Sequence, residues 1–491
     1  MEIMSMKRIK GYHILAGLAL ILVLYFPLFL HLDSLPVTVW DESLFALRAL
    51  HLFEEGSYLY NFNFYTDLPN HPNTKLPFTT FFQVLGYHVF GVNELGLRLP
   101  IIFLFLGLTG WMGFYFKKHF SVWGPILIFL FILIASPGFV RPHMLRTGDQ
   151  DVPFAMYLLC ATLLFFQYLH STKGKYVWGF ALACIAALMT KNLLAGIIAP
   201  GLLVYVIYQK KWRWLFRRPE WYGALFLIIG VYAGSLVYFE WQHPGFIDRM
   251  WNYELMGRYQ KTIEGHQGGP LYYLNRLIRG MGVFFWPAIF SPLLLSVPDV
   301  PNRWKSLIRI LWMSMLSYGL IISFSATKTS WYVAPLYPGF ALLSAVSLWH
   351  LYQWYFVNRP RSWQVSVSLI CIFIYSWNYG HTIASNYKPK PSTKGSKYGL
   401  FLKQLDRSNA PYREFTILDN NFGTSAYFYT QMYNRLDPTY QLTYKRYIHL
   451  QPGQKLMSCL NDVLKPIDQK YEYKVLEEYS GCQLLEITAE K

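Results

Sequence analysis

Eleven apolar runs constrain this chain more than any other feature of its sequence. A helix needs about 20 residues to cross a hydrocarbon core of about 30 Å. The runs lie at residues 13–32, 99–116, 123–139, 152–169, 176–190, 192–208, 221–239, 281–298, 307–325, 331–350 and 364–380. Only 14% of the residues are charged, against about 25% in globular chains. The sequence therefore excludes a soluble enzyme and predicts a mostly α polytopic membrane protein with about 11 transmembrane helices (range 10–13).

The net charge of +17 would suggest a nucleic-acid partner in a soluble protein, so the positions of the basic residues matter. If the N-terminus is cytosolic, the short connections on the cytosolic side hold 17 Lys and Arg residues, and the longer opposite loops hold 12. By the positive-inside rule this asymmetry predicts a cytosolic N-terminus. Membrane orientation then accounts for the basic excess, so the charge no longer indicates binding to nucleic acid. The basic start and the first apolar run, with no small-residue cleavage site, predict an uncleaved anchor in the cytoplasmic (inner) membrane.

An odd number of spans places the tail outside the cytosol. Residues 388–395 have linker composition, and the chain then alternates a helix-like stretch at 398–407 with strand-like runs at 415–418, 474–478 and 483–488. We expect a transmembrane domain over residues 1–384 and a small periplasmic α/β domain over 385–491. In an oxidising compartment Cys459 and Cys482 form either a disulfide or two buried free thiols.

Two outer loops are long, at residues 33–98 and 240–280. Loops of more than about 15 residues are usually functional. Both are rich in Trp, Tyr, Phe and Leu, which predicts interfacial helices lying along the membrane surface. We expect these two loops to cover the outer ends of the spans.

Ionisable residues gather at four outer connections. Asp41 and Glu42 follow the first span directly, and the other three groups lie at residues 141–153, 190–192 and 326–332. A short turn between helices does not need such residues, and ionisable groups at membrane depth indicate function. The sequence thus predicts a site of mixed charge on the outer face.

That mixture of charge suits the transfer of a sugar from a polyprenyl phosphate. The phosphate leaves as an anion, so it needs preorganised cations, for which Lys75 and Arg258 are candidates. The incoming hydroxyl needs a carboxylate base, for which Asp41 is the candidate. Because phosphate is already a competent leaving group, no general acid is required.

Six stretches of the sequence then resemble, in order, one family of enzymes. They are Asp41-Glu42, His71–Phe78 with Leu85–Pro100, Asp149-Gln150-Asp151-Val152-Pro153, Thr190-Lys191-Asn192, Arg258 with Gly265–Pro270, and Ser325–Lys328 with Tyr332–Pro338. The pattern resembles the bacterial protein-mannosyltransferase-like and aminoarabinose-transferase-like glycosyltransferases of the GT-C superfamily. Leu76 stands where a proline is usual in that family.

The resemblance implies an inverting glycosyltransferase that uses a polyprenyl-phosphate sugar donor at the periplasmic surface. Asp41, with Glu42 beside it, would supply the base, and Asp149 or preferably Asp151 a second acidic group. Further residues follow from the matched motifs. Lys75, Arg258, Lys191 and Lys328 would contact the donor phosphate, and His266 and Tyr332 would belong to the substrate loop.

Simpler interpretations stay open for several of these residues. Lys75, Lys191 and Lys328 are each compatible with a depth anchor at the membrane surface. No cofactor is required. Some members of the family bind a divalent metal ion, for which His266 and His71 are candidates, although histidines in aromatic interfacial loops are more often hydrogen-bonded structure.

The sequence does not identify the acceptor of the sugar. Lipid A, a protein and an envelope glycan are all compatible with the resemblance. A flippase should carry polar or broken-helix features near mid-membrane, which the spans lack. A glycan ligase or polymerase should depend on Arg and His in one large outer loop rather than on an acidic pair after the first span. A scaffold would not need charge at four outer connections.

Overall fold

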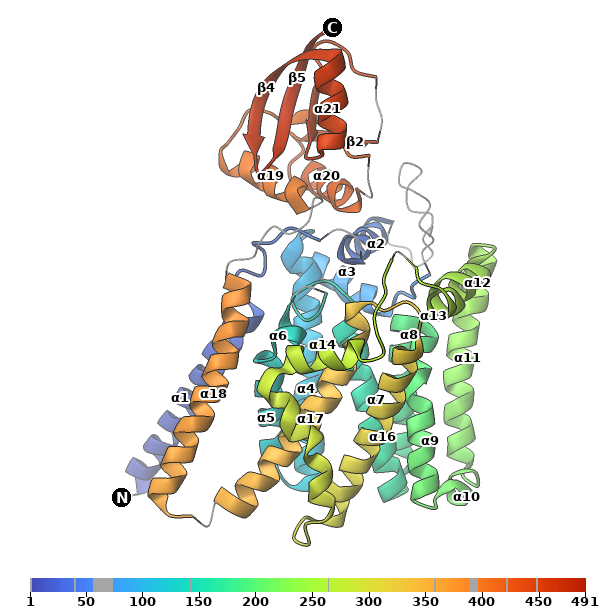
Figure 1. The fold of residues 1–491 in the computed structure, drawn as a ribbon, viewed down its shortest axis with the longest axis vertical. Helices are drawn as coiled ribbons and strands as arrows, with labels where there is room; N and C mark the ends of the chain where they lie inside the picture. Colours follow the sequence, from blue (N-terminus) through green and yellow to red (C-terminus); the bar gives the residue numbers. More distant parts are fainter. Residues whose placement is uncertain are drawn as a thin grey trace.

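The structure is a computed structural model that describes residues 2–38, 41–55, 74–141, 143–263, 265–356, 359–387, 396–420, 423–446 and 449–491. Helices form the part before residue 388, and a small sheet domain follows (Figure 1). The longer helices before residue 388 are α1 (Glu2–Leu28), α2 (Asp41–Glu55), α3 (Phe78–Phe90), α4 (Glu94–Phe120), α5 (Gly124–Ile134), α7 (Asp151–Ser171), α8 (Gly174–Lys191), α9 (Ala199–Tyr208), α11 (Pro219–Gln242), α14 (Tyr272–Met281), α16 (Asn302–Phe324), α17 (Leu336–Leu351) and α18 (Arg361–Tyr387). Short turns of helix join them, among them α6 (Pro137–Val140), η1 (Asn192–Ile198), α10 (Trp212–Leu215), α12 (Phe246–Arg249), η2 (Met250–Leu255), α13 (Met256–Gln260), η3 (Gly282–Phe284), α15 (Phe285–Ile289), η4 (Ser291–Leu295), η5 (Ser330–Val333) and η6 (Tyr352–Phe356).

The chain is a multi-pass membrane protein, as predicted. Helical structure lies over each of the eleven apolar runs. Seven described segments are long and apolar enough by themselves to cross a membrane, namely Glu94–Phe120, Asp151–Ser171, Gly174–Tyr208, Pro219–Gln242, Tyr272–Leu295, Asn302–Phe324 and Ser330–Trp354. The apolar helices Ile14–Leu28 and Gly124–Ile134 are shorter. The total number of crossings stays a prediction.

The segment Gly174–Tyr208 consists of two legs that run in opposite directions. At the end of α8, Lys191 is paired with Asp151, the first residue of α7. Just after α9, Lys211 donates to the carbonyl of Leu169, near the last residue of α7. The reversal occurs in η1, which begins at Asn192 with a positive φ of 53°. This turn places Lys191 and Asn192 together at one end of the bundle.

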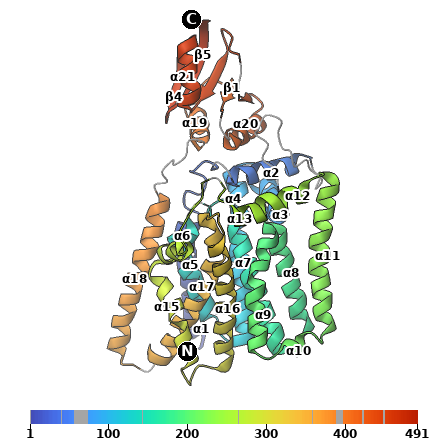
Figure 2. The same ribbon diagram turned by 45° about the vertical axis from the view of Figure 1, so that its right-hand side comes forward.

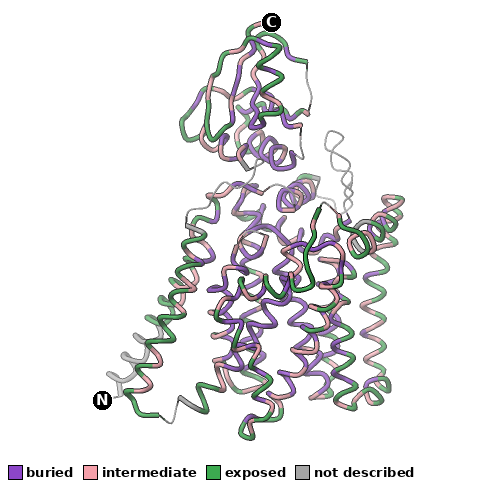
Figure 3. Tube along the Cα trace, viewed as in Figure 1, coloured by how far each residue is buried: buried purple, intermediate pink, exposed green. Residues whose placement is uncertain are grey.

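Two helices form the buried centre of the bundle. Of the residues in the apolar stretch of α7, 94% are buried inside the protein. The share is 83% in the Ser330–Trp354 segment, which contains α17, and only 17% in α11 (Figure 3). A lipid-facing helix exposes its apolar side chains to the hydrocarbon, so this contrast separates core from periphery. Because α7 is central, the acidic residues at its start lie buried inside the protein rather than at its edge.

The N-terminus and the sheet domain lie at opposite ends of the helix bundle (Figure 1). Helices α2 and α3 of the first long loop lie at the domain end, and α2 crosses over the bundle beneath the domain (Figure 2). The second long loop contains α12, η2 and α13 at the same end. Both long loops therefore contain helices, as predicted.

The C-terminal domain is a small α/β unit, in agreement with the predicted fold class. Its sheet has the order β2-β1-β3-β5-β4, with β1 (Glu414–Leu418) parallel to β2 (Gln441–Lys445) and β3 (Lys455–Ser458). Strand β5 (Cys482–Glu490) is antiparallel to β3 and to β4 (Tyr471–Tyr479). The helices are α19 (Ser396–Arg407), α20 (Thr424–Leu436) and α21 (Asn461–Lys470). The expected helix and three strands are present, while α20, α21, β2 and β3 were not predicted.

A disulfide joins Cys459 to Cys482 across 23 residues of this domain. This bond decides between the two alternatives that the sequence left open for these cysteines. Closing a loop of that length restricts the unfolded chain and stabilises the domain by about 3 kcal/mol. Cys160, Cys184 and Cys371 are free thiols in the helical part.

Candidate functional site

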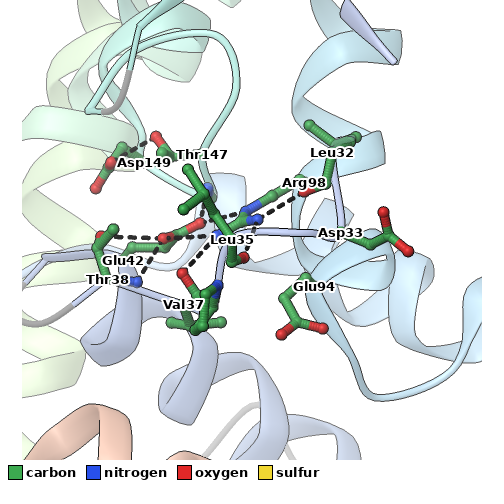
Figure 4. A network of polar contacts seen from close by, with 12 residues as sticks. Leu32, Asp33, Leu35, Val37, Thr38, Glu42, Glu94, Arg98, Thr147 and Asp149 are labelled. Atoms are coloured by element: carbon green, nitrogen blue, oxygen red, sulfur yellow. Dashed lines mark hydrogen bonds and ion pairs between the residues drawn. The ribbon is translucent and has the colours of Figure 1, made fainter. Parts of the chain in front are cut away.

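A buried ion pair joins Glu42, at the start of α2, to Arg98 of α4 (Figure 4). Arg98 Nε lies 2.7 Å from Glu42 Oε1, and Arg98 Nη2 lies 3.1 Å from Glu42 Oε2. Glu42 also accepts from the backbone N–H of Thr38 at 2.8 Å and from that of Gly148 at 3.0 Å. Burial by itself raises the pKa of the Glu42 carboxyl, but the Arg98 charge and these hydrogen bonds outweigh it and hold the pKa below its ordinary value.

Two arginines fix the chain between the first span and α2. Arg98 donates to the carbonyl oxygens of Leu32, Leu35 and Pro36 at 2.6, 2.7 and 3.1 Å. Arg146 donates in the same way to the carbonyls of Pro27 and Leu30, at 2.9 and 2.6 Å. Carbonyls at a helix C-terminus have no partner within the helix, so bound cations stabilise them. The segment that leads to Asp41 is thereby held in one position.

Asp41, His143 and Asp149 form a compact group at this position. One potential ligand atom from each of the three lies within 4.8 Å of the others. His143 Nδ1 is 3.6 Å from Asp149 Oδ2, which also accepts from the Thr147 hydroxyl at 2.6 Å. Asp41 is half-buried, whereas Asp149 is almost completely buried. Residues from the first loop and from the connection before α7 are therefore brought together.

The environment of this group makes Asp149 unusual. Burial raises the pKa of its carboxyl to about 7, although His143 opposes the shift. His143 has a positive φ of 64°, and its ring stacks on Trp331 with centroids 5.0 Å apart. A left-handed backbone is uncommon for a residue other than glycine and often marks a functional site.

The same group has the donors for a divalent cation. Asp149 Oδ1 and His143 Nδ1 are buried without a hydrogen-bond partner among the residues that the structure describes. Two carboxylates and an imidazole suit a transition-metal ion better than Ca²⁺, which takes oxygen ligands alone. These residues therefore fit the possible metal ion, whereas His266 is not part of the group and His71 lies outside the described residues.

A second acid–base pair lies at the start of α7. Lys191 Nζ is 2.6 Å from Asp151 Oδ1, and both side chains are largely buried. The Lys191 ammonium also lies 5.8 Å from the centre of the Tyr332 ring. Asp151 occupies the N-terminus of α7, where the helix dipole favours a negative charge. Lys191 is thus a cation held in place by an acid.

Lys75 belongs to the same end of the bundle. The carbonyl of its neighbour Thr74 accepts a hydrogen bond of 2.9 Å from the Asn192 side chain. Asn192 follows Lys191 directly, so the contact ties the Lys75 segment to the turn after α8. Lys75 itself is half-buried.

The second long loop reaches this region through Arg258. The backbone N–H groups of Ala326 and Thr327 donate to the carbonyls of Tyr259 and Arg258, at 2.9 and 3.0 Å, which docks the loop onto the segment before η5. Arg258 Nη1 lies 3.5 Å from the Tyr332 hydroxyl. Lys191 and Arg258 therefore both lie beside Tyr332.

Lys328 and His266 hold the loops together. The Lys328 ammonium donates to the carbonyls of Ser323 and Ser325, at 2.6 and 2.9 Å, and its burial lowers its pKa. The Lys328 backbone N–H donates to the His266 carbonyl at 3.1 Å, and the His266 ring meets Trp331 edge-on at 6.1 Å. These contacts give both residues partners within the protein.

Sequence reasoning missed three residues of this region. His143 stood in a connection singled out for its charge, but it was not chosen because a lone histidine has no spacing that identifies it. Arg98 was counted with the first outer loop and lay in the matched Leu85–Pro100 stretch, but nothing in the sequence pairs it with Glu42, which lies 56 residues away. Trp331 was counted with the aromatic residues of the membrane surface.

Comparisons with known proteins agree with this architecture. Residues 70–238 match the dolichyl-phosphate-mannose-protein mannosyltransferase family. The crystal structure of ArnT from Cupriavidus metallidurans bound to undecaprenyl phosphate superimposes with a TM-score of 0.71 at 16% identity, covering 97% of this chain and 98% of that one. The family match covers residues 70–238 of the chain, and the ArnT match shows that the two chains share a fold.

Two further proteins extend the comparison. The apo oligosaccharyltransferase of Archaeoglobus fulgidus shares the fold with a TM-score of 0.50 at 12% identity, over 85% of this chain and 64% of that one. A protein of Aquifex aeolicus (strain VF5) is 26% identical over 339 residues, which are 66% of this chain and 62% of that protein. The match thus spans less than two thirds of the Aquifex protein's length.

Proposed function

We propose that this chain is a GT-C glycosyltransferase that moves a sugar from a polyprenyl-phosphate donor to a hydroxyl of an acceptor at the outer face of the cytoplasmic membrane, with inversion at the anomeric carbon. The observation that carries the proposal is the meeting of Asp41 and Asp149 with the cations Lys75, Lys191 and Arg258 at one end of the bundle. Carboxylates suit an incoming hydroxyl, and cations suit a departing phosphate.

Asp41 is the proposed base. It lies at the start of α2 beside His143 and Asp149, and it is the most exposed acid of the group. Both Glu42 carboxylate oxygens already accept from Arg98 and from Thr38 or Gly148, so we assign Glu42 to positioning rather than to proton transfer. Asp151 is proposed to orient Lys191 toward the donor.

The four candidate cations differ in their contacts within the protein, and we propose different roles for them. Lys75, Lys191 and Arg258 come from three separate elements that meet around the turn after α8 and Tyr332. Lys328 already donates to two carbonyls, so we propose that it holds the loop that carries Tyr332. A divalent cation held by Asp41, His143 and Asp149 would add positive charge beside the phosphate.

An apolar cavity of about 610 Å³ supports a donor with an isoprenoid chain. It lies among α7, α8, η1, α9 and α11, and Leu188, Ala195 and Gly196 line it on either side of Lys191. Leu188 lies one helical turn before Lys191 in α8, so this apolar space comes within one turn of the charged site. ArnT of Cupriavidus metallidurans, the similar structure, was crystallised with undecaprenyl phosphate.

Lys75→Ala and Arg258→Ala are expected to weaken donor binding by tenfold to a hundredfold, because each removes a charge-assisted contact with phosphate worth about 1.5–3 kcal/mol. Binding of a polyprenyl-phosphate sugar to the purified protein measures the effect. Lys261→Ala is the control, since Lys261 lies in the same loop as Arg258 but is exposed. Equal affinity in all four proteins would refute the assignment.

Gly196→Trp is expected to raise KM for a long-chain donor about tenfold, because the indole fills space that the isoprenoid would occupy. A methyl carbon added at Gly196 meets no atom within 4 Å, so the fold should tolerate the change. A donor with a short prenyl chain should keep its KM. Gly230→Trp, also in open space on the lipid-facing surface, is the matched control.

The acceptor is proposed as lipid A, a protein or an envelope glycan, all of which offer a hydroxyl or phosphate at the outer face. Mass spectrometry of these three fractions, from cells with and without the protein, tests the proposal and identifies the class. The loss of one pentose or hexose from a single fraction is the expected result. Identical sugar content in all three would contradict the proposed function.

A further inference from the structure

The C-terminal domain shares a hydrophobic core with the segment that carries the proposed base. Val37, Leu47 and Leu50 belong to one buried cluster with Phe401 and Phe428 of the domain. Gly399 in α19 permits the close approach, since a methyl carbon there would lie 2.4 Å from the Tyr429 ring and 2.8 Å from Pro36. The domain therefore packs directly on the chain around Asp41 and is not a separate appendage.

Hydrogen bonds from α20 hold the chain on both sides of Asp41. The Val37 N–H donates to the Tyr429 hydroxyl at 2.8 Å, and the Ser425 hydroxyl donates to the Val37 carbonyl at 2.8 Å. On the other side of Asp41, the Ser43 and Thr424 hydroxyl oxygens are 2.6 Å apart. Tyr429, Ser425 and Thr424 are all fully buried. Buried hydrogen bonds of this kind restrict the local backbone because breaking one leaves polar groups unsatisfied.

Tyr429 also contacts the helix that carries Arg98. Its hydroxyl donates to Glu94 Oε1 at 2.5 Å, and Lys403 Nζ of α19 lies 2.6 Å from the same oxygen. Glu94 is one helical turn before Arg98 in α4, and Arg98 binds Glu42. A single hydroxyl thus joins the Val37 segment before Asp41 to helix α4.

We propose that Tyr429 is a positioning residue for sugar transfer, and that the C-terminal domain fixes Asp41 relative to the phosphate-binding cations. The inference rests on the proposed function of Asp41 as the base. A base must stay within hydrogen-bond reach of the hydroxyl that it deprotonates, and displacement by about 1 Å costs roughly a hundredfold in rate. The domain acts through the Val37 main chain and the Ser43 hydroxyl, on either side of Asp41.

The experiment compares Tyr429→Phe with Tyr398→Phe in the full-length protein in nanodiscs. Tyr398 is an equally buried tyrosine of the same domain, and its hydroxyl bonds the Leu418 carbonyl inside the domain. Tyr429→Phe should lower kcat about tenfold and leave KM for the donor within about twofold. It should also accelerate amide hydrogen exchange at residues 37–43. Tyr398→Phe should change neither quantity, even where both variants lower Tm.

Gly399→Ala gives a second test, because its methyl carbon displaces Tyr429 and Pro36 and leaves every hydroxyl present. It should lower kcat in the same direction. Unchanged kcat and unchanged exchange in Tyr429→Phe would overturn the inference, as would equal losses in Tyr398→Phe. If the wild-type protein transfers no sugar, the proposed function fails, and the exchange rates alone then decide whether the domain fixes residues 37–43.

Discussion

Asp41→Asn is expected to lower the rate of sugar transfer by about a thousandfold and to leave donor affinity nearly unchanged. An amide cannot accept the proton of the incoming hydroxyl, and general bases contribute about 10²–10⁴ to the rate. Asparagine has the same shape as aspartate, and Asp41 is only half-buried, so the fold should persist. Single-turnover transfer from bound donor measures the chemical step apart from binding.

Asp33→Asn is the matched control for this variant. Asp33 lies in the same segment before α2, its side chain is exposed, and it is not a member of the acidic group. Its substitution should leave transfer at the wild-type rate. Asp41→Asn protein with activity close to wild type would remove Asp41 from the role of base. That outcome would fit an acceptor phosphate, which is already anionic and needs positioning rather than deprotonation.

Glu42→Gln is expected to destabilise the protein by about 3–5 kcal/mol. The amide leaves Arg98 as a buried charge without its counterion, and removing one partner of a buried pair has this cost. The exposed pair Arg435–Glu54, at 2.9 Å and about 40% exposed, provides the control. Arg435→Ala should change stability by less than about 1 kcal/mol.

The effect of Glu42 on stability should depend on pH. Its folded-state pKa is lower than that of the unfolded chain, so its contribution is complete above the ordinary carboxyl value of 4.5 and is lost as the pH falls toward the folded-state pKa. The difference between wild type and Glu42→Gln should therefore shrink in acid. Thermal unfolding in detergent from about pH 7 down to about pH 2 tests this, and a difference that stays constant below the ordinary carboxyl pKa would contradict it.

Much of the helical architecture could be predicted because each span is encoded locally. A continuous apolar run such as 152–169 has a single stable solution in a bilayer, and α7 is found over Asp151–Ser171. The same holds for the placement of Lys191 at one end, since it lies between two runs, and for Asp41 and Lys75, since both lie in the loop between the first two runs. In the sheet domain, α20 was missed because its sequence has several aromatic and β-branched residues, which favour strands as often as helices.

The internal geometry of the site could not be predicted, because it depends on pairings between distant residues. Glu42 and Asp41 are adjacent acids in the sequence, yet one is fully buried against Arg98 and the other is half-buried beside His143. No local pattern distinguishes them. Likewise, the contact between Val37 and Tyr429 joins residues 392 positions apart.

That separation implies an order of assembly during synthesis. Chains grow at roughly 5–20 residues per second, so Tyr429 emerges about 20–80 s after Val37 has been made. Until α20 folds and reaches it, the segment with Asp41 lacks the hydrogen bonds that flank it on both sides. On the proposed function, the nascent protein would be inserted in the membrane before Asp41 is held in place, and sugar transfer would begin only once the last domain has folded.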